Sequence, residues 1–182
     1  MNKKILVTYA SRTGSTAQIA EAICKTLIQN GEETELLPMQ DVNDLSAYHA
    51  VIIGSPIRKS QWLPEAMQFL QNHRAELARK RVVTFTVCIT IAMSNDERYQ
   101  QAVREWIAPV RAKVRPVSEG LFAGKLDFNK LPWTLDTLLF RATIALDILL
   151  KGDHRDWIAV HTWAQSLRPL LLQQLHWLWT LL

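Results

Sequence analysis

Short apolar runs alternate with helix-like stretches from residue 4 to residue 122. The runs are rich in Val, Ile and Leu, and the longest reads VVTFTVCITI. In the intervening stretches, apolar residues recur every three or four positions, as on one face of a helix. The pattern predicts strands at 4–9, 34–37, 50–54, 82–91 and 114–122, with helices at 15–29, 63–77 and 96–110 between them. Such alternation is typical of an α/β fold, a doubly wound parallel sheet with helices on both faces, because parallel strands are joined by crossovers that pack on the sheet.

The chain of 182 residues is predicted to form a single domain, residues 1–182, in which two segments depart from this plan. Residues 123–151 form an insert before the last helix, with a wide apolar arc at helical spacing. Residues 169–182 form an apolar C-terminal tail with two Trp, and Pro169 is expected to end or kink the helix before it. That last helix is expected to begin after Asp153, which can serve as its N-cap.

The charge and the cysteines limit the possible environments. A net charge of +4 and a pI near 9.2 suit an anionic ligand, an anionic membrane surface or nucleic acid. Nucleic acid is disfavoured, because the basic residues form no stripe with interleaved aromatics. Cys24 and Cys88 have no metal-ligand spacing and are predicted to be buried free thiols in a reducing cytoplasm. We expect neither a signal peptide nor a membrane-spanning helix, since no apolar segment has the required length.

The turn between the first strand and the first helix has an unusual composition. It reads Ser11-Arg12-Thr13-Gly14-Ser15-Thr16, with four hydroxyls, one cation, one glycine and no carboxylate. A helix N-terminus offers unpaired N–H groups and a partial positive charge, so this turn is predicted to bind an anion, best a phosphate. The P-loop and the dinucleotide GxGxxG patterns are both absent. The alternative is a hydroxyl-rich N-cap that holds no ligand.

This turn resembles the T/S-x-T-G-x-T phosphate loop of flavodoxins. The resemblance implies a flavodoxin-like five-stranded sheet in the order 2-1-3-4-5, plus a helical insert before the last helix, and FMN as cofactor. It implies that two further loops hold the flavin ring. The cofactor-binding residues so implied are Ser11, Arg12, Thr13, Gly14, Ser15, Thr16, Ser55, Pro56, Ile57, Arg58, Trp62, Thr90, Ile91, Ala92, Met93, Ser94 and Asn95. Trp62 is the candidate to stack on the ring, and the equal alternative is a core Trp under the following helix.

Four features resemble the menaquinone-dependent protoporphyrinogen IX dehydrogenase family. They are IGSPIR at the third strand, Arg12 in the phosphate loop, the long insert, and GDHRDW at 152–157. The resemblance implies oxidation of protoporphyrinogen IX, in haem biosynthesis, with a membrane quinone as acceptor. The flavin carries the chemistry, so no catalytic side chain and no metal site is expected. Arg58 and Lys59 are the expected contacts to substrate propionates, against the alternative of a solvated surface pair.

Two other function classes remain open at this stage. One is a flavodoxin-like electron carrier or general quinone reductase, and the other is a binding module that kept the fold and lost FMN. The five histidines lie in no motif and are predicted to be structural, with His49 at the sheet end opposite the flavin.

The insert and the tail bear on localisation. Trp and Leu on one side, with Lys125, Lys130, Arg141 and Lys151 nearby, suit a helix lying in an anionic membrane interface. The equal alternative for the insert is packing on the protein's own core or against a second copy in a homodimer. The expected localisation is cytoplasmic, and peripheral contact with the inner face of the cell membrane is a further hypothesis.

Overall fold

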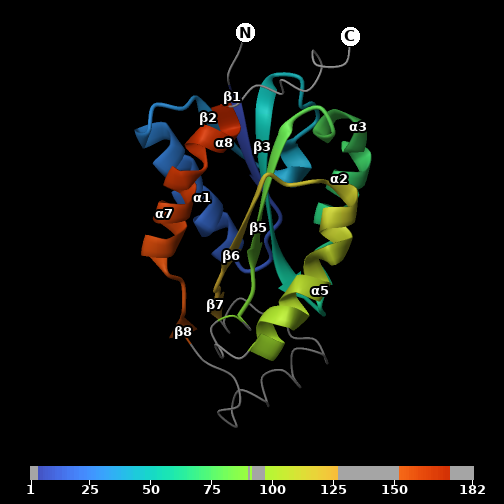
Figure 1. Cartoon of the computed structure of the whole chain (residues 1–182), viewed down its shortest axis with the longest axis vertical. Coiled ribbons are helices and arrows are strands. Elements are labelled where there is room, and N and C mark those ends of the chain that lie inside the picture. The colour runs from blue at the N-terminus through green and yellow to red at the C-terminus, as the bar shows by residue number, and fades with distance from the viewer. Residues whose placement is uncertain (1–3, 90, 92–96, 127–151, 173–182) are drawn as a thin grey trace.

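The computed structural model describes residues 4–89, 91, 97–126 and 152–172. Its centre is a parallel sheet in the order β2-β1-β3-β5-β6 (Figure 1). The strands are β1 (Lys4–Tyr9), β2 (Thr34–Pro38), β3 (Tyr48–Arg58), β5 (Arg81–Val87) and β6 (Ser118–Phe122). A short strand β4 (Gln61–Trp62) pairs antiparallel with the end of β3. The predicted doubly wound sheet, with its strand order 2-1-3-4-5 for the five parallel strands, is confirmed.

Helices cover both faces of the sheet (Figure 1). One face carries α1 (Ser15–Gln29), α7 (Trp157–Ser166) and α8 (Arg168–Leu172). The other face carries α2 (Pro64–Asn72), α3 (Arg74–Leu77) and α5 (Glu97–Lys113), with the short 3-10 helix η1 (Met39–Asp41) beside β2. A separate two-stranded sheet joins β7 (Lys125–Leu126) to β8 (Gly152–Asp153), at the lower end of the molecule in Figure 1.

The sheet separates two hydrophobic cores. Strand β3 supplies both, because its side chains alternate between the faces: Ala50 and Ile52 pack towards α1 and α7, while Val51 and Ile53 pack towards α2 and α5. A strand buried on both faces must be apolar at every position, which explains the continuous run AVIIG. Gly54 ends this run because a Cβ there would lie 1.9 Å from the ring of Phe85 on the neighbouring strand β5.

Helix α1 shows how the sequence pattern becomes packing. Ile19, Ile23 and Leu27 are fully buried against the sheet, and they recur at four-residue intervals on one side of the helix. The helix ends where Asn30 caps it and Gly31 takes a φ of 87°, a left-handed conformation that glycine adopts without strain. The predicted bounds 15–29 are confirmed.

Several predicted boundaries were wrong. The strand expected at 82–91 ends at Val87, and the strand expected at 50–54 spans Tyr48–Arg58. The helix expected at 63–77 is two helices, because the chain turns at His73, whose ring packs on Phe69 at 4.7 Å. The strand expected from residue 114 begins at Ser118, since α5 continues to Lys113. The last helix is capped by Asp156, whose carboxylate accepts the Ala159 N–H at 2.9 Å. Asp153, the predicted cap, lies instead in β8.

The predicted helical insert and apolar tail lie mostly outside the described residues, which leave out 127–151 and 173–182. Helix α7 ends before Pro169, as expected, and α8 covers the first residues of the tail. Within the described ranges, no helix is both long enough and apolar enough to cross a membrane.

A cluster of polar side chains links the amino-terminal ends of β1, β2 and β3. The Tyr48 hydroxyl donates to Glu35 at 2.7 Å, and Lys4 Nζ lies 2.6 Å from the same carboxylate. Burial, then the hydrogen bond to Glu35, raises the pKa of Tyr48 to about 12 from its ordinary 10.0. Because the folded pKa lies above the unfolded one, this group's contribution to stability is complete below pH 10 and is lost as the pH rises towards about 12.

We expect Tyr48→Phe to lower the free energy of unfolding by about 1 kcal/mol at neutral pH, because one buried hydrogen bond is lost. The difference between wild type and variant should then narrow between pH 10 and about 12, since only the wild type loses this contribution there. Urea unfolding at several pH values measures both effects. Tyr99→Phe, on an exposed part of α5, is the control and should match the wild type at neutral pH. A constant gap across the alkaline range would contradict the prediction.

Candidate anion-binding site at the carboxyl ends of the strands

The turn after β1 leaves the start of helix α1 open. Gly14 occupies the N-cap position with φ 88° and ψ −12°, a left-handed conformation, and no side chain caps the helix. The first hydrogen bond within the helix runs from Gln18 N–H to Gly14 O at 3.0 Å, so the amides of residues 15–17 lie ahead of it. The first turn contains no acidic residue. An uncapped helix start of this kind suits an anion.

The hydroxyls of the turn take part in its own architecture. Ser11 Oγ accepts the Gly14 N–H at 3.1 Å and thereby holds the turn closed. Ser15 Oγ accepts the Lys125 N–H at 2.9 Å. Each of these oxygens keeps its own O–H for a ligand. Thr16 is buried, whereas Thr13 is half-buried at the surface of the turn.

The side chain of Arg12 pairs with a distant element of the fold, helix α2. Its guanidinium forms a two-point ion pair with Glu65 of α2, with distances of 2.5 and 2.8 Å. The sequence shows a turn without a carboxylate, and the fold places one beside it. Arg12 therefore lies at the edge of the candidate anion site, and its guanidinium is already paired with Glu65. A phosphate bound there would compete with the Glu65 carboxylate for this guanidinium.

The second predicted loop, 55–62, is mostly a β-hairpin. Strand β3 continues to Arg58, and β4 returns with Ile57 opposite Trp62 and Arg58 opposite Gln61. The two tip residues, Lys59 and Ser60, both have positive φ, as in the tight turns that match strand twist. Such a conformation is uncommon for residues other than glycine. The hairpin brings Arg58 and Lys59 to a fixed tip at the same edge of the sheet as Gly14.

Of the two equal alternatives for Trp62, the core position beneath the following helix is confirmed and stacking on a flavin ring was wrong. Its side chain is 1% exposed in the core beneath α2, and its Nε1 donates to Thr86 Oγ1 at 3.0 Å. The chain doubles back at the hairpin, which turns Trp62 inward. Ser55 supports the same corner, since its Oγ accepts the Leu63 N–H at 3.1 Å.

The third predicted loop is only partly described. Cys88 N–H donates to Phe122 O at 2.9 Å and continues the β5–β6 pairing beyond the strands. Ile91 lies just beyond, at the same sheet edge. Thr90, Ala92, Met93, Ser94 and Asn95 lie outside the described residues, so their assignment to the flavin ring stays a prediction.

The β7–β8 pair is attached directly to the anion site. Besides the bond from Lys125 to Ser15, His154 N–H donates to Gly124 O, and Arg155 hydrogen bonds to Gln18 on the first turn of α1. Arg155 also donates to Asp153, which holds the pKa of that carboxyl below its usual range. The described residues that flank 127–151, residues 126 and 152, are therefore anchored beside the turn after β1. Sequence reasoning singled out GDHRDW without predicting this contact.

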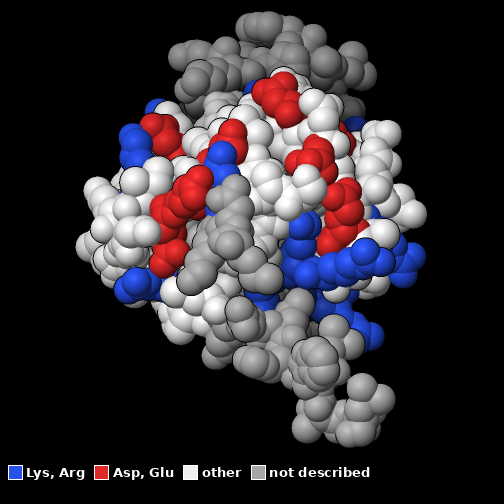
Figure 2. Space-filling model, turned by 90° about the horizontal axis from the view of Figure 1, so that it is seen from above, with Lys and Arg blue, Asp and Glu red and all other residues white. Residues whose placement is uncertain are grey.

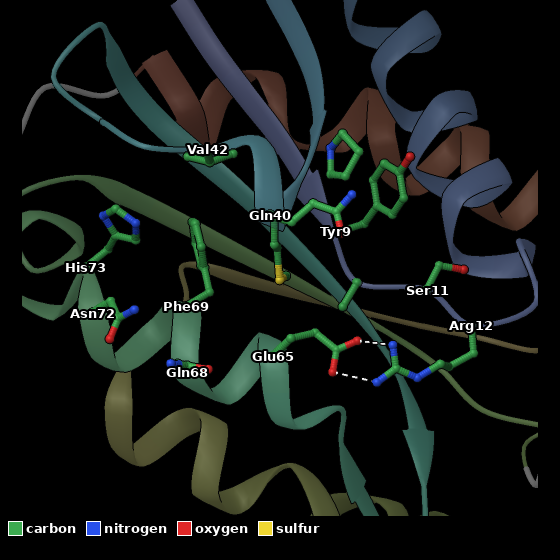
Figure 3. A pocket seen from close by; sticks show the side chains of 13 residues that line it. Tyr9, Ser11, Arg12, Gln40, Val42, Glu65, Gln68, Phe69, Asn72 and His73 are labelled. Atoms are coloured by element: carbon green, nitrogen blue, oxygen red, sulfur yellow. Dashed lines mark hydrogen bonds and ion pairs between the residues drawn. The ribbon is translucent and has the colours of Figure 1, made fainter.

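A cleft of about 670 Å³ opens on the other side of the turn (Figure 3). It runs between the end of β2 with η1 and the exposed side of α2, and Ser11 and Arg12 form one end of it. Its lining is polar, with the carboxamides of Gln40, Gln68 and Asn72. The hairpin after β3 does not line it. The cleft therefore lies apart from the hairpin, and the turn after β1 borders it through Ser11 and Arg12.

Three of the described histidines have side-chain contacts that hold the fold. His49 Nδ1 lies 3.0 Å from Lys4 O at the far end of the sheet, and His161 Nδ1 lies 2.7 Å from Thr26 Oγ1 between α7 and α1. His73 pairs with Glu76. Over the ranges the structure covers, no group of three or more His, Cys, Asp or Glu is placed to hold a metal ion. Cys24 and Cys88 are buried free thiols, as predicted.

The flavodoxin domain family matches residues 6–142, and the chain belongs to that family. FMN is the cofactor of the flavodoxin family, and the uncapped start of α1 suits a phosphate. No curated protein matches the chain in sequence. The match is to the flavodoxin domain, and it gives no support to the narrower resemblance to protoporphyrinogen dehydrogenases.

Solved structures show the same fold. A flavodoxin from Streptococcus pneumoniae TIGR4 is similar at a TM-score of 0.55 and 15% identity, covering 91% of this chain and 98% of that one. A short-chain flavodoxin associated with a PDU bacterial microcompartment is similar at 0.57 and 10% identity, covering 93% and 99%. Rubredoxin oxygen:oxidoreductase from Desulfovibrio gigas is similar at 0.50 and 18% identity, covering 94% of this chain and 38% of that one.

The Arg12–Glu65 pair makes a prediction about anion affinity. Glu65→Gln should tighten FMN binding by about threefold, because it removes a negative charge from the edge of the site and leaves Arg12 to the phosphate. The pair is half-exposed, so the stability loss should stay below about 1 kcal/mol. Quenching of FMN fluorescence by apoprotein measures affinity. Glu76→Gln, farther along the same side of the sheet, is the control; weaker binding in Glu65→Gln would contradict the prediction.

Proposed function

We propose that the chain is an FMN-dependent electron-transfer protein, a flavodoxin-type carrier or a quinone reductase. The observation that carries the proposal is the uncapped N-terminus of α1 behind a left-handed Gly14. The amides there offer hydrogen bonds to a dianionic phosphate without a competing side chain. Two solved structures with flavodoxin in their names share the fold along most of both chains, which supports the carrier function.

The chain's own residues have separable tasks in this proposal. The turn Ser11–Thr16 would anchor the phosphate, and Ser11 Oγ keeps Gly14 in position for it. The hairpin after β3 would meet the flavin ring with backbone groups near Ile57 and Arg58, since Trp62 is turned away. FMN supplies the electron exchange when bound, and the protein supplies its orientation and electrostatics.

A second candidate function is the oxidation of protoporphyrinogen IX with a quinone acceptor. One specific observation favours it: the residues on either side of 127–151 pair with each other as β7 and β8, and Lys125 of β7 donates to Ser15 of the turn. Arg58 and Lys59 at the hairpin tip are cations suited to the propionates of a porphyrinogen.

Gly14 offers a sharp test of the phosphate assignment. Gly14→Ala and Gly31→Ala place a side chain at nearly the same φ, 88° and 87°, at opposite ends of α1. Both should cost about 1–2 kcal/mol of stability, because the left-handed region is unfavourable for alanine. Only Gly14→Ala should weaken FMN binding, by about tenfold or more, since it disturbs amides that bind a charged group.

FMN titration of the two variants measures this difference, and riboflavin, which lacks the phosphate, is the second control. Wild-type protein should bind FMN far more tightly than riboflavin. Equal affinity for the two flavins, or equal loss in both glycine variants, would contradict the assignment. Thr13→Ala and Thr16→Ala should also retain FMN less well than the wild type.

The activity itself is tested with FMN-loaded protein under anaerobic conditions. Protoporphyrinogen IX and a menaquinone analogue are added, and porphyrin fluorescence is followed. A quinone-dependent rise that is absent without FMN would establish the second candidate. A flavin that accepts and returns electrons without any porphyrin signal would leave the carrier or quinone reductase.

A further inference from the structure

The cleft beside α2 exists because the connection from β2 to β3 is unusually light. Parallel strands are joined by crossovers that usually contain an α-helix packed on the sheet. Between β2 and β3 the chain has only the 3-10 helix η1 and an irregular stretch before Tyr48. The face of the sheet next to β1 and β2 is therefore open between η1 and α2, over a volume of about 670 Å³. This size lies within the range of small-molecule sites, roughly 300–1,000 Å³.

The cleft combines a buried apolar interior with a polar rim. Met39, Val42 and Phe69 line it although each is buried, so they form its inner wall. The ring of Phe69 packs on that of His73 at 4.7 Å, which places two rings side by side on the α2 wall. Three exposed carboxamides form the rim, and none of them hydrogen bonds to another described residue: Gln40, Gln68 and Asn72. Such a cleft suits a planar ring with polar edges.

The lining residues of α2 follow one another along the cleft at helical spacing. The series begins at the ion pair of Arg12 with Glu65, continues through residues 68–69 and ends at residues 72–73, with Gln40 across the cleft on η1 (Figure 3). From residue 65 to residue 72 the helix rises about 10 Å. This is the span of a nucleotide from its phosphate to the far edge of its base.

The chemistry along the cleft changes in the order that a nucleotide requires. The guanidinium of Arg12 can bind a phosphate, and the carboxylate of Glu65 can accept hydrogen bonds from ribose hydroxyls. Beyond them, Asn and Gln side chains pair with the N6 and N7 edge of adenine, and aromatic rings provide stacking for a base. Guanine is read instead by Arg or Lys. Among the described residues that line the cleft, Arg12 at its phosphate end is the only Arg or Lys.

We propose that the cleft beside α2 binds an adenylate group, either as free adenosine monophosphate (AMP) or as the AMP half of FAD. Ser11 and Arg12 belong both to the turn after β1 and to the cleft. A flavin whose first phosphate lies at the start of α1 can therefore extend its adenylate past Arg12 into the cleft. Binding of free AMP does not depend on a flavin, whereas binding of FAD rests on the proposed function.

The first experiment compares FMN with FAD by calorimetric titration of the apoprotein. We expect FAD to bind about tenfold more tightly, because its adenine gains hydrogen bonds to the carboxamides. Gln68→Ala with Asn72→Ala should remove this advantage and leave FMN affinity unchanged. Gln29→Ala with Gln71→Ala removes two exposed carboxamides outside the cleft and is the matched control. Gln68 and Asn72 are exposed, so the variant should unfold at the wild-type temperature.

The second experiment measures binding of free AMP and of guanosine monophosphate (GMP) by equilibrium dialysis. Protein already loaded with FMN is used beside apoprotein, so that AMP in the loaded protein cannot occupy the turn after β1. We expect AMP to bind both forms, GMP to bind about tenfold more weakly, and the Gln68→Ala, Asn72→Ala variant to lose the preference for AMP.

The two experiments separate the sources of the adenylate. A preference for FAD without binding of free AMP identifies the AMP half of FAD, and binding of AMP without a preference for FAD identifies a separate nucleotide; both support the proposal. Equal affinity for FMN and FAD together with no binding of AMP would overturn it and leave the proposed function intact. Equal binding of AMP and GMP, or equal losses in the two double variants, would overturn it as well. Binding of AMP by a protein that does not bind FMN would support the cleft and contradict the proposed function alone.

Discussion

The parallel pairing of β1 with β3 is the constraint on which the candidate site depends. Register places Tyr9 opposite Gly54, so the turn after β1 and the hairpin after β3 emerge at one edge of the sheet. The two crossovers then leave on opposite faces, α1 on one and α2 on the other, which opens the switch point between them. An uncapped helix start and a strained hairpin tip are local features. The pairing makes them parts of one site.

Close packing at the centre of the sheet holds that pairing in register. Strand β3 has apolar neighbours on both faces, and Gly54 admits the ring of Phe85 where any side chain would collide with it. A one-residue slip of β3 would exchange its two faces and lose both cores at once. The turn after β1 and the hairpin after β3 therefore start from fixed positions in the sheet.

The two ends of the sheet differ in how their charged residues are arranged. At the strand ends, the cations Arg12, Arg58 and Arg155 lie around a helix start, and two of them are already paired with Glu65 and Asp153. At the opposite end, which Figure 2 views directly, residues 74–81 and 111–119 hold seven cations and two carboxylates, and the carboxylates pair with Arg111 and His73.

The sequence by itself determined the alternation of strands and helices and the bounds of helix α1, because hydrophobic periodicity is local and strong. The strand order followed from the resemblance to flavodoxins, and the turn after β1 was singled out by its composition. Three things only the tertiary structure decided. Glu65 reaches Arg12 from 53 residues away, the hairpin turns Trp62 into the core, and β7 with β8 fastens the insert to Ser15. Each depends on contacts between segments that are far apart in the chain, and such contacts leave no period in the sequence from which to predict them.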